Sequence, residues 1–397
     1  MIILGKAPIG EEGGVDAIEG IPSTETRIQY GGTIPTDNSG ILKYVSIRHG
    51  GSVLGADNEI NGLTLGGVGS GTEIDYVEIF ATKDDGIEIF GGTVNPKHIV
   101  TAFVGDDGFD VDESWSGFSQ FVFGIAANEH AIEYDGTEDA DFTCATEPVG
   151  RIYNGTFIGD PANSISRGAR IRSNGSVQIW NSIFADINDY IYRFDANSCG
   201  ANAVAGNIVA PGFRTLVNGT QPTIFDVAQV NPDFGGISRL PNGGLDPRPN
   251  LNSPIFTGVA TPASNEAEVV NYRGAFDCDN WMKGWSALSQ YGYFGELATC
   301  TSSTYQENEN GVAVSTYPNP VYGFNTNVSF ELPQASDVTL KLYDMTGKLV
   351  VANDLGRAAA GTNNATLNVG QLLSGLYVLA VETSFGTVTQ KITVFNR

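Results

Sequence analysis

One short motif recurs at a fixed spacing and constrains how this 397-residue chain can fold. The motif is Asp-Asp-Gly followed by alternating apolar residues, and it occurs in TKDDGIEIFGG, from Thr82, and in VGDDGFDVDES, from Val104. Aligning the glycines extends the series to Gly62–Leu65, Ala131–Tyr134 and Gly168–Ile171. A second series of strand-like segments runs in step with it, at spacings of 22 to 24 residues where the turns are short. Such a period is typical of a solenoid in which each coil stacks on the previous one.

We therefore predict an all-β fold, with a right-handed parallel β-helix over residues 1–255. Residues 256–300 are predicted to cap the stack, because the last coil would otherwise expose strand edges. Residues 301–315 form a polar linker in this interpretation, and the alternating strands of 316–397 predict a small immunoglobulin-like β-sandwich. The chain starts with strand-like residues in mid-pattern, so we expect that an upstream segment of the β-helix precedes it.

Acidic residues outnumber basic ones by 45 to 21, which gives a formal net charge of −24. Residues 312–397 are balanced, with five acidic and five basic residues, so the whole excess lies in the predicted β-helix. Such a surface repels nucleic acids and anionic membranes and attracts cations, with calcium as the expected one. No run of 18 apolar residues is present, so we expect no membrane span.

The predicted strands present charged residues on their outward positions, because side chains alternate between the two faces of a sheet. The outward positions are Glu88 and Phe90, Asp110 and Asp112, Glu133 and Asp135, and Arg170 and Arg172 on successive coils. The paired turn aspartates would stack about 4.8 Å apart. Their repulsion, about 3 kcal/mol at an effective dielectric constant of about 20, can be relieved by a cation, by protonation or by water. We predict a calcium site formed by Asp84, Asp85, Asp106 and Asp107.

The coil pattern resembles the pectate-lyase and polygalacturonase class of β-helices. Asp84-Asp85, Asp106-Asp107, His130 and Arg170-Ile171-Arg172 follow the order of the motifs of polygalacturonase-like enzymes. The chain departs from that pattern where Glu129-His130-Ala131 lacks the expected glycine, and where Arg172 stands in place of lysine. The resemblance implies a polysaccharide-degrading enzyme whose candidate catalytic residues are Asp106, Asp107, His130 and Arg170.

Other residues would fit the same chemistry. Asp110 and Asp112 are two positions apart on one strand, about 6.5–7 Å, which is the separation used by inverting glycosidases. Arg170 and Arg172 could bind a sugar carboxylate, and Trp115 could stack on a sugar ring, although core or turn packing is the more common role of such a tryptophan. The three histidines stand far apart in the sequence and suggest no metal site.

The four cysteines lack the spacing of a zinc site. Their even number in a chain that looks exported predicts two disulfides, Cys278–Cys300 and Cys144–Cys199, with four buried free thiols as the alternative.

The last 80 residues carry a second resemblance. The motifs Pro318-Asn319-Pro320, Asp344-Met345-Thr346-Gly347-Lys348, Gly375-Leu376-Tyr377 and Lys391 are similar to those of the type A C-terminal sorting domain of type IX secretion cargo. This implies recognition by the type IX machinery, export from a Gram-negative bacterium, and removal of the tail with surface anchoring or release. A generic immunoglobulin-like module of an adhesin is the alternative.

Three functions therefore stay open. The first is a secreted or surface-attached β-helix that binds extracellular polysaccharide or acts as an adhesin. The second is a polysaccharide hydrolase or lyase that uses the acidic face. The third is a subunit of an extracellular filament.

Overall fold

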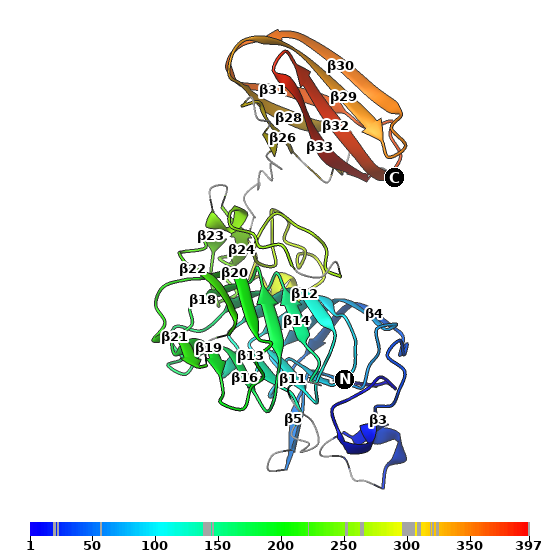
Figure 1. The fold of residues 1–397 in the computed structure, drawn as a ribbon, viewed down its shortest axis with the longest axis vertical. Coiled ribbons are helices and arrows are strands. Elements are labelled where there is room, and N and C mark those ends of the chain that lie inside the picture. Colours follow the sequence, from blue (N-terminus) through cyan, green and yellow to red (C-terminus); the bar gives the residue numbers. More distant parts are fainter. Residues whose placement is uncertain are drawn as a thin grey trace. The chain divides into compact units, whose positions relative to one another are not determined.

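The computed structural model describes residues 1–18, 21, 24–55, 58–137, 144, 147–220, 222–250, 253–262, 266–295, 306–307, 311–317, 319, 321–322 and 325–395. They fall into two compact units, Met1–Leu297 and Ala298–Arg397 (Figure 1). Among the described residues, no helix is both long enough and apolar enough to cross a membrane.

The first unit is built from two long parallel sheets, and the chain contributes strands to them alternately. One sheet has eight strands: β1 (Ile2–Leu4), β7 (Leu63–Gly66), β9 (Ile87–Phe90), β11 (Phe109–Asp112), β13 (His130–Asp135), β16 (Arg167–Arg172), β19 (Tyr190–Phe194) and β21 (Thr215–Gly219). The second has ten: β4 (Ile41–Arg48), β8 (Glu73–Phe80), β10 (Lys97–Ala102), β12 (Phe118–Ile125), β14 (Gly150–Tyr153), β15 (Thr156–Ile158), β17 (Val177–Trp180), β18 (Ile183–Ala185), β20 (Ala203–Val209) and β22 (Ile224–Gln229). This alternation of parallel strands defines a parallel β-helix.

The strand register confirms the alignment of the repeats made from the sequence. In the eight-stranded sheet Leu63 pairs with Ile87, Ile87 with Phe109, Phe109 with Ile132, and Ile132 with Ala169. All five side chains are fully buried and belong to one hydrophobic core between the sheets. Their sequence neighbours point to the opposite face, so Thr64, Glu88 and Asp110 form an outward row.

The segment predicted to close the end of the stack lies elsewhere. Residues 234–294 include β23 (Phe234–Gly236), β24 (Asp246–Pro249), η3 (Pro254–Phe256) and α1 (Ala287–Gln290). Apolar residues of this segment, among them Phe276 and Met282, pack in one cluster with Val100 and Phe123 of β10 and β12. Residues 266–295 therefore cover the outer side of the ten-stranded sheet along its middle coils, because the outward apolar side chains of that sheet also need burial.

The N-terminal segment packs beside the eight-stranded sheet. It contains η1 (Glu12–Gly14), η2 (Thr26–Ile28) and the antiparallel pair β2 (Asp16–Ala17) and β3 (Gln29–Tyr30); a second short pair is β5 (Ser52–Gly55) and β6 (Asn58–Ile60). The side chain of Phe90 points outward from β9, and Ile9, Ile28 and Tyr30 bury its ring. The Tyr30 hydroxyl also donates a 2.7 Å hydrogen bond to Oε1 of Glu113.

The cysteines of the first unit are oxidised. A disulfide links Cys144 to Cys199, one of the two expected pairs. Cys278 is also disulfide-bonded, and its predicted partner Cys300 lies outside the described residues.

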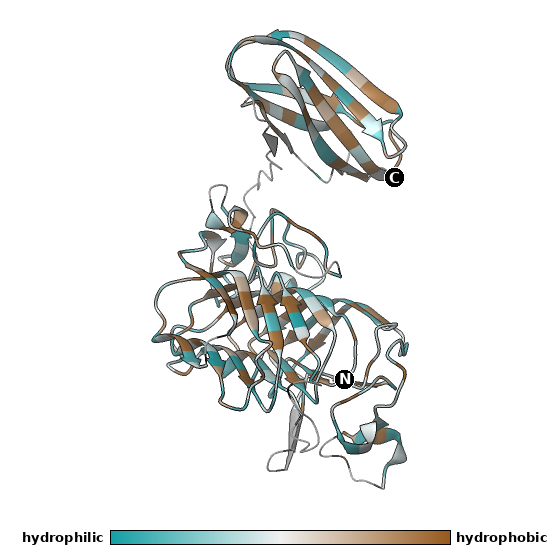
Figure 2. Ribbon diagram, in the orientation of Figure 1, coloured by the Kyte–Doolittle hydropathy of each residue, from teal (hydrophilic) through white to brown (hydrophobic). Residues whose placement is uncertain are grey.

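The second unit is a β-sandwich of two sheets. One contains β25 (Gln306–Glu307), β26 (Ala313–Tyr317), β28 (Asn325–Leu332) and β31 (Gly361–Asn368). The other contains β27 (Val321–Tyr322), β33 (Gly386–Phe395), β32 (Gly375–Thr383), β29 (Ser336–Asp344) and β30 (Leu349–Ala358). Apolar and polar residues alternate along these strands (Figure 2), and the inward set, including Phe330, Leu340 and Leu379, forms a separate core.

The motif residues of the tail hold this sandwich together. Asn319 receives a 2.9 Å hydrogen bond from the backbone of Thr393 and donates one of 2.8 Å to the carbonyl of Lys391. Gly347 sits in the β29–β30 turn with a φ of +83°, which favours glycine. Tyr377, in the strand that Gly375 begins, donates its hydroxyl to the carbonyl of Leu373 at 2.8 Å. Pro318 and Pro320 lie outside the described residues.

Candidate functional site

The repeated Asp-Asp-Gly motif forms the turns that enter β9 and β11, and its second aspartate bonds to the next coil. Oδ1 of Asp85 accepts a 2.9 Å hydrogen bond from the backbone N–H of Asp107, and Oδ1 of Asp107 accepts one of 2.6 Å from that of His130. The glycine is required because a Cβ at Gly86 would lie 2.5 Å from the carbonyl oxygen of Gly108. Part of the repeat is therefore structural.

The outward side chains of these coils form what we call the acidic face. Its members share one side of the eight-stranded sheet and are Asp84, Asp85, Glu88, Asp106, Asp107, Asp110, Asp112, Glu133 and Asp135. Ligand atoms lie within 4.8 Å of one another in three sets: Asp84, Asp85 and Asp106; Asp85, Glu88 and Asp110; and Asp107, His130 and Glu133. The structure thus groups three of the four predicted calcium ligands and places Asp107 with His130 instead.

Burial and mutual repulsion raise the pKa values of these carboxyl groups. Burial raises the pKa of Asp106 to about 6, with Glu129 and Asp84 adding to the shift. The pKa of Asp112 is raised to about 8 by burial and then by Asp135. The pKa of Asp110 lies well above its ordinary value, because the group is buried and faces Asp85. Near neutral pH such a face either holds protons or gains from a bound cation.

The predicted sugar-binding arginines are engaged with carboxylates of the chain itself. Arg170 contacts Glu133 at 3.2 Å and Asp195 at 3.0 Å. Arg172 contacts Glu133 at 3.0 Å and Asp135 at 2.6 Å. The two arginines therefore neutralise the end of the acidic face nearest to β16, and a sugar carboxylate would have to displace these contacts.

The predicted sugar-stacking role of Trp115 is wrong. Its side chain has no exposed surface, its Nε1 donates a 3.0 Å hydrogen bond to the carbonyl of Val94, and its ring packs on Phe109. An aromatic ring needs an exposed face to stack on a sugar, so Trp115 is a core residue.

Replacing Trp115 by phenylalanine is expected to cost about 1–3 kcal/mol of stability, through the lost hydrogen bond and a small cavity. Urea unfolding of the full chain measures this loss, and unchanged stability would contradict the assignment to the core.

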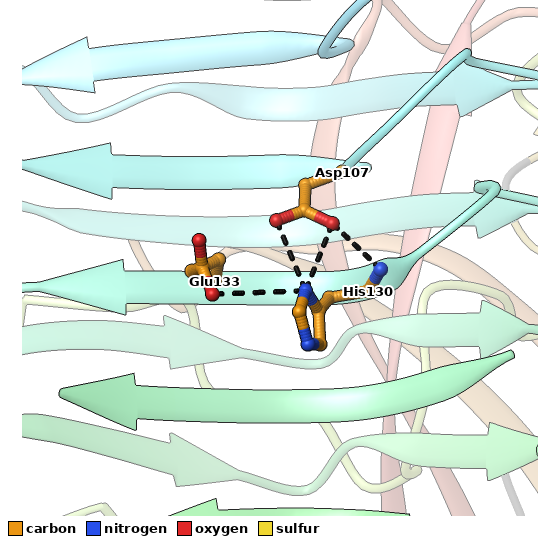
Figure 3. A group of neighbouring side chains, drawn as sticks. All are labelled: Asp107, His130 and Glu133. Carbon is orange, nitrogen blue, oxygen red and sulfur yellow. Dashed lines mark hydrogen bonds and ion pairs between the residues drawn. The ribbon is translucent and has the colours of Figure 1, made fainter. Parts of the chain in front are cut away.

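The candidate catalytic residues Asp107 and His130 are in contact, but both are buried. Nδ1 of His130 lies 3.0 Å from Oδ1 and 3.1 Å from Oδ2 of Asp107 (Figure 3). Asp106 precedes Asp107 in the same turn. His130 is 1% exposed, Asp107 5% and Asp110 8%. Burial lowers the pKa of His130 to about 4, so its ring is neutral near pH 7. A glycosidase needs its acid and base in contact with substrate and water, and these exposures do not provide that.

Two stacked parallel sheets with an acidic outer face define the first unit as a parallel β-helix protein domain. The chain belongs to the pectate-lyase-like β-helix family, whose domain model matches residues 1–233. Residues 315–395 match the secretion system C-terminal sorting domain. This tail identifies a cargo of the type IX secretion system, directed to the cell surface or the extracellular space.

No curated protein matches the chain. One solved structure that it resembles is the full-length tailspike protein 2 of Escherichia coli O157:H7 bacteriophage CAB120, with 10% identity and a TM-score of 0.18. The match covers 90% of this chain and 59% of the tailspike chain.

Proposed function

We propose that this protein is a secreted surface β-helix that binds calcium on its acidic face and, through the calcium, extracellular polysaccharide. One observation carries the proposal: carboxylate oxygens of Asp84, Asp85 and Asp106 lie within 4.8 Å of one another. Asp84 and Asp106 are partly exposed, so a cation there can keep open positions for an outside ligand. Calcium takes six to eight oxygen ligands and accepts irregular geometry, which suits carboxylates from stacked turns.

The calcium would also explain how an acidic face binds a polymer. A bare face with this charge repels a polysaccharide that carries carboxylates, whereas a bound divalent cation can bridge the two. The paired arginines and the burial of Asp107 and His130 support binding over hydrolysis. Export through the sorting domain brings the β-helix to the place where such polymers are found.

Retention on immobilised polysaccharide tests the proposal. We expect the full chain to be retained by polygalacturonate or alginate with calcium and released by a chelator. The double variant Asp84→Asn/Asp106→Asn should lose most of the retention. Glu331→Gln/Asp337→Asn makes the same charge change on exposed residues of the sorting domain and should bind like the wild type.

The same experiment separates binding from hydrolysis. Equal retention with calcium and with chelator would contradict the calcium bridge. Release of new reducing ends by the wild type, lost in Asp107→Asn, would make the protein an enzyme instead.

A further inference from the structure

Three side chains from adjacent coils meet next to the calcium ligands proposed above, Asp84, Asp85 and Asp106. Asp107 comes from the turn before β11, and His130 and Glu133 lie on β13 (Figure 3). Nδ1 of His130 faces both carboxylates, at 3.0 Å and 3.1 Å from Asp107 and 3.7 Å from Oε1 of Glu133. A neutral imidazole has one N–H at most on this atom, so it cannot donate to both carboxylates at once with good geometry.

These separations match the edges of a metal coordination shell. Nitrogen and carboxylate ligands lie about 2.0–2.2 Å from a zinc ion. Two ligands at about 2.1 Å from a tetrahedral ion are about 3.4 Å apart. The distances from Nδ1 to Asp107 and to Glu133, 3.0 Å and 3.7 Å, lie on either side of this value, so small side-chain shifts would bring all three groups onto one ion.

The other nitrogen of the ring is already held in place. Nε2 of His130 lies 2.8 Å from the hydroxyl of Tyr190, which is buried on β19. If Nε2 carries the proton and donates it to Tyr190, the lone pair of Nδ1 points at the two carboxylates. Histidine ligands of metals are commonly oriented by such a hydrogen bond from the second ring nitrogen.

The charges around these three side chains favour a bound cation. Glu133 is paired with Arg170 and Arg172, but among the described residues no lysine or arginine forms an ion pair with Asp107. Asp107 is nonetheless 5% exposed, and a buried carboxylate without a cationic partner is costly. A divalent ion between Asp107, Nδ1 and Glu133 would supply the missing charge.

We propose that Asp107, His130 and Glu133 form a binding site for a transition-metal dication such as Zn²⁺, separate from the calcium ligands. Imidazole is a ligand that zinc prefers and calcium does not, so the two sites differ in chemistry. Water or an inner carboxylate oxygen would complete the shell. Because its ligands come from two successive coils, the bound ion would cross-link the turn before β11 to β13.

Zinc titration of the full chain, first stripped of metal and then saturated with calcium, tests this proposal. Competition with a chromophoric chelator should reveal one zinc per chain. Glu133→Gln, which keeps the side-chain shape, should weaken zinc binding at least about tenfold, and His130→Ala should remove it. Cobalt in place of zinc should give a visible d–d band that is lost in both variants.

A second histidine provides the matched control. Nδ1 of His98 lies 2.7 Å from Oδ1 of Asp75, but among the described residues no second carboxylate forms an ion pair with His98. His98→Ala should therefore bind zinc like the wild type. Circular dichroism confirms the fold of each variant, and Glu133→Gln decides the question if His130→Ala does not fold.

Three results would overturn the site: no saturable zinc binding in the presence of calcium, unchanged affinity in Glu133→Gln, or an equal loss in His98→Ala. Because calcium is present throughout, failure of the zinc site leaves the calcium-dependent retention on polysaccharide untouched.

Discussion

In the absence of divalent cations, the protein is expected to become less stable as the pH rises from 6.5 to 8.5. Burial raises the pKa of Glu147 to about 7 and that of Glu113 to about 9, and burial with the nearby Asp135 raises that of Asp112 to about 8. In each case the folded pKa exceeds the unfolded one, so the folded state binds more protons. The stability from these groups is complete below the unfolded pKa and is lost as the pH rises through the folded pKa.

Each proton that the folded state holds in excess of the unfolded state lowers the stability by about 1.4 kcal/mol per pH unit. His130 acts in the opposite sense, since its pKa is lowered to about 4, but that contribution changes below its unfolded value near 6.5 and so lies outside the window. Urea unfolding of the full chain with a chelator at pH 6.5, 7.5 and 8.5 measures the slope. A flat or rising stability would contradict the assignment.

Glu113→Gln supplies the control for this prediction. Glu113 is 7% exposed and accepts the hydroxyl of Tyr30, and glutamine can accept the same hydrogen bond without titrating. The variant should lose up to about 1.4 kcal/mol per pH unit less than the wild type over the same window. An identical slope in both proteins would show that Glu113 does not take up a proton on folding.

Arg172→Met is expected to destabilise the protein by about 2–3 kcal/mol at pH 7.5, because buried Asp135 loses its arginine partner, although the Arg172 side chain is 38% exposed and water screens part of the interaction. Arg172 bonds to Asp135, which is 3% exposed, and to Glu133, which is 9% exposed. Methionine keeps much of the apolar stem, so the loss reports the charge. The cost should shrink as the pH falls, because burial raises the pKa of Asp135 above its ordinary value and protonation removes the charge that Arg172 neutralises.

Arg214→Met is the matched control for Arg172→Met. Arg214 pairs with Asp189 at 2.9 Å, but its side chain is 71% exposed. Water screens such a pair, so its loss should cost about 1 kcal/mol or less. Equal losses in the two variants, measured by urea unfolding, would mean that burial of the partner carboxylates does not set the cost.

The sequence contained enough information for the β-helix because the repeat fixes the register. Each coil repeats one apolar alternation, so aligning Leu63, Ile87 and Phe109 was sufficient to predict which residues stack. The outward rows follow from the same alternation. The β-sandwich could also be predicted, because apolar and polar residues alternate along its strands and Gly347 marks a turn.

Features that depend on tertiary contact could not be read in this way. The apolar composition of the segment around Phe276 indicates that the segment is buried, but it does not indicate which surface it covers. In the structure the segment covers the side of a sheet and not the end of the stack. The burial of Trp115 depends on how the turn after β11 folds back. The three histidines stand far apart in the sequence, and the contact of His130 with Asp107 arises only because 23 residues make one coil.

Calcium titration of the metal-stripped full chain by isothermal calorimetry is the most direct test of the central claim, that the acidic face binds calcium. We expect saturable binding in the wild type, a marked loss of affinity in Asp84→Asn/Asp106→Asn, and wild-type binding in Glu331→Gln/Asp337→Asn. No saturable binding, or equal binding in all three proteins, would contradict it and leave the repeated Asp-Asp-Gly as a turn that joins one coil to the next.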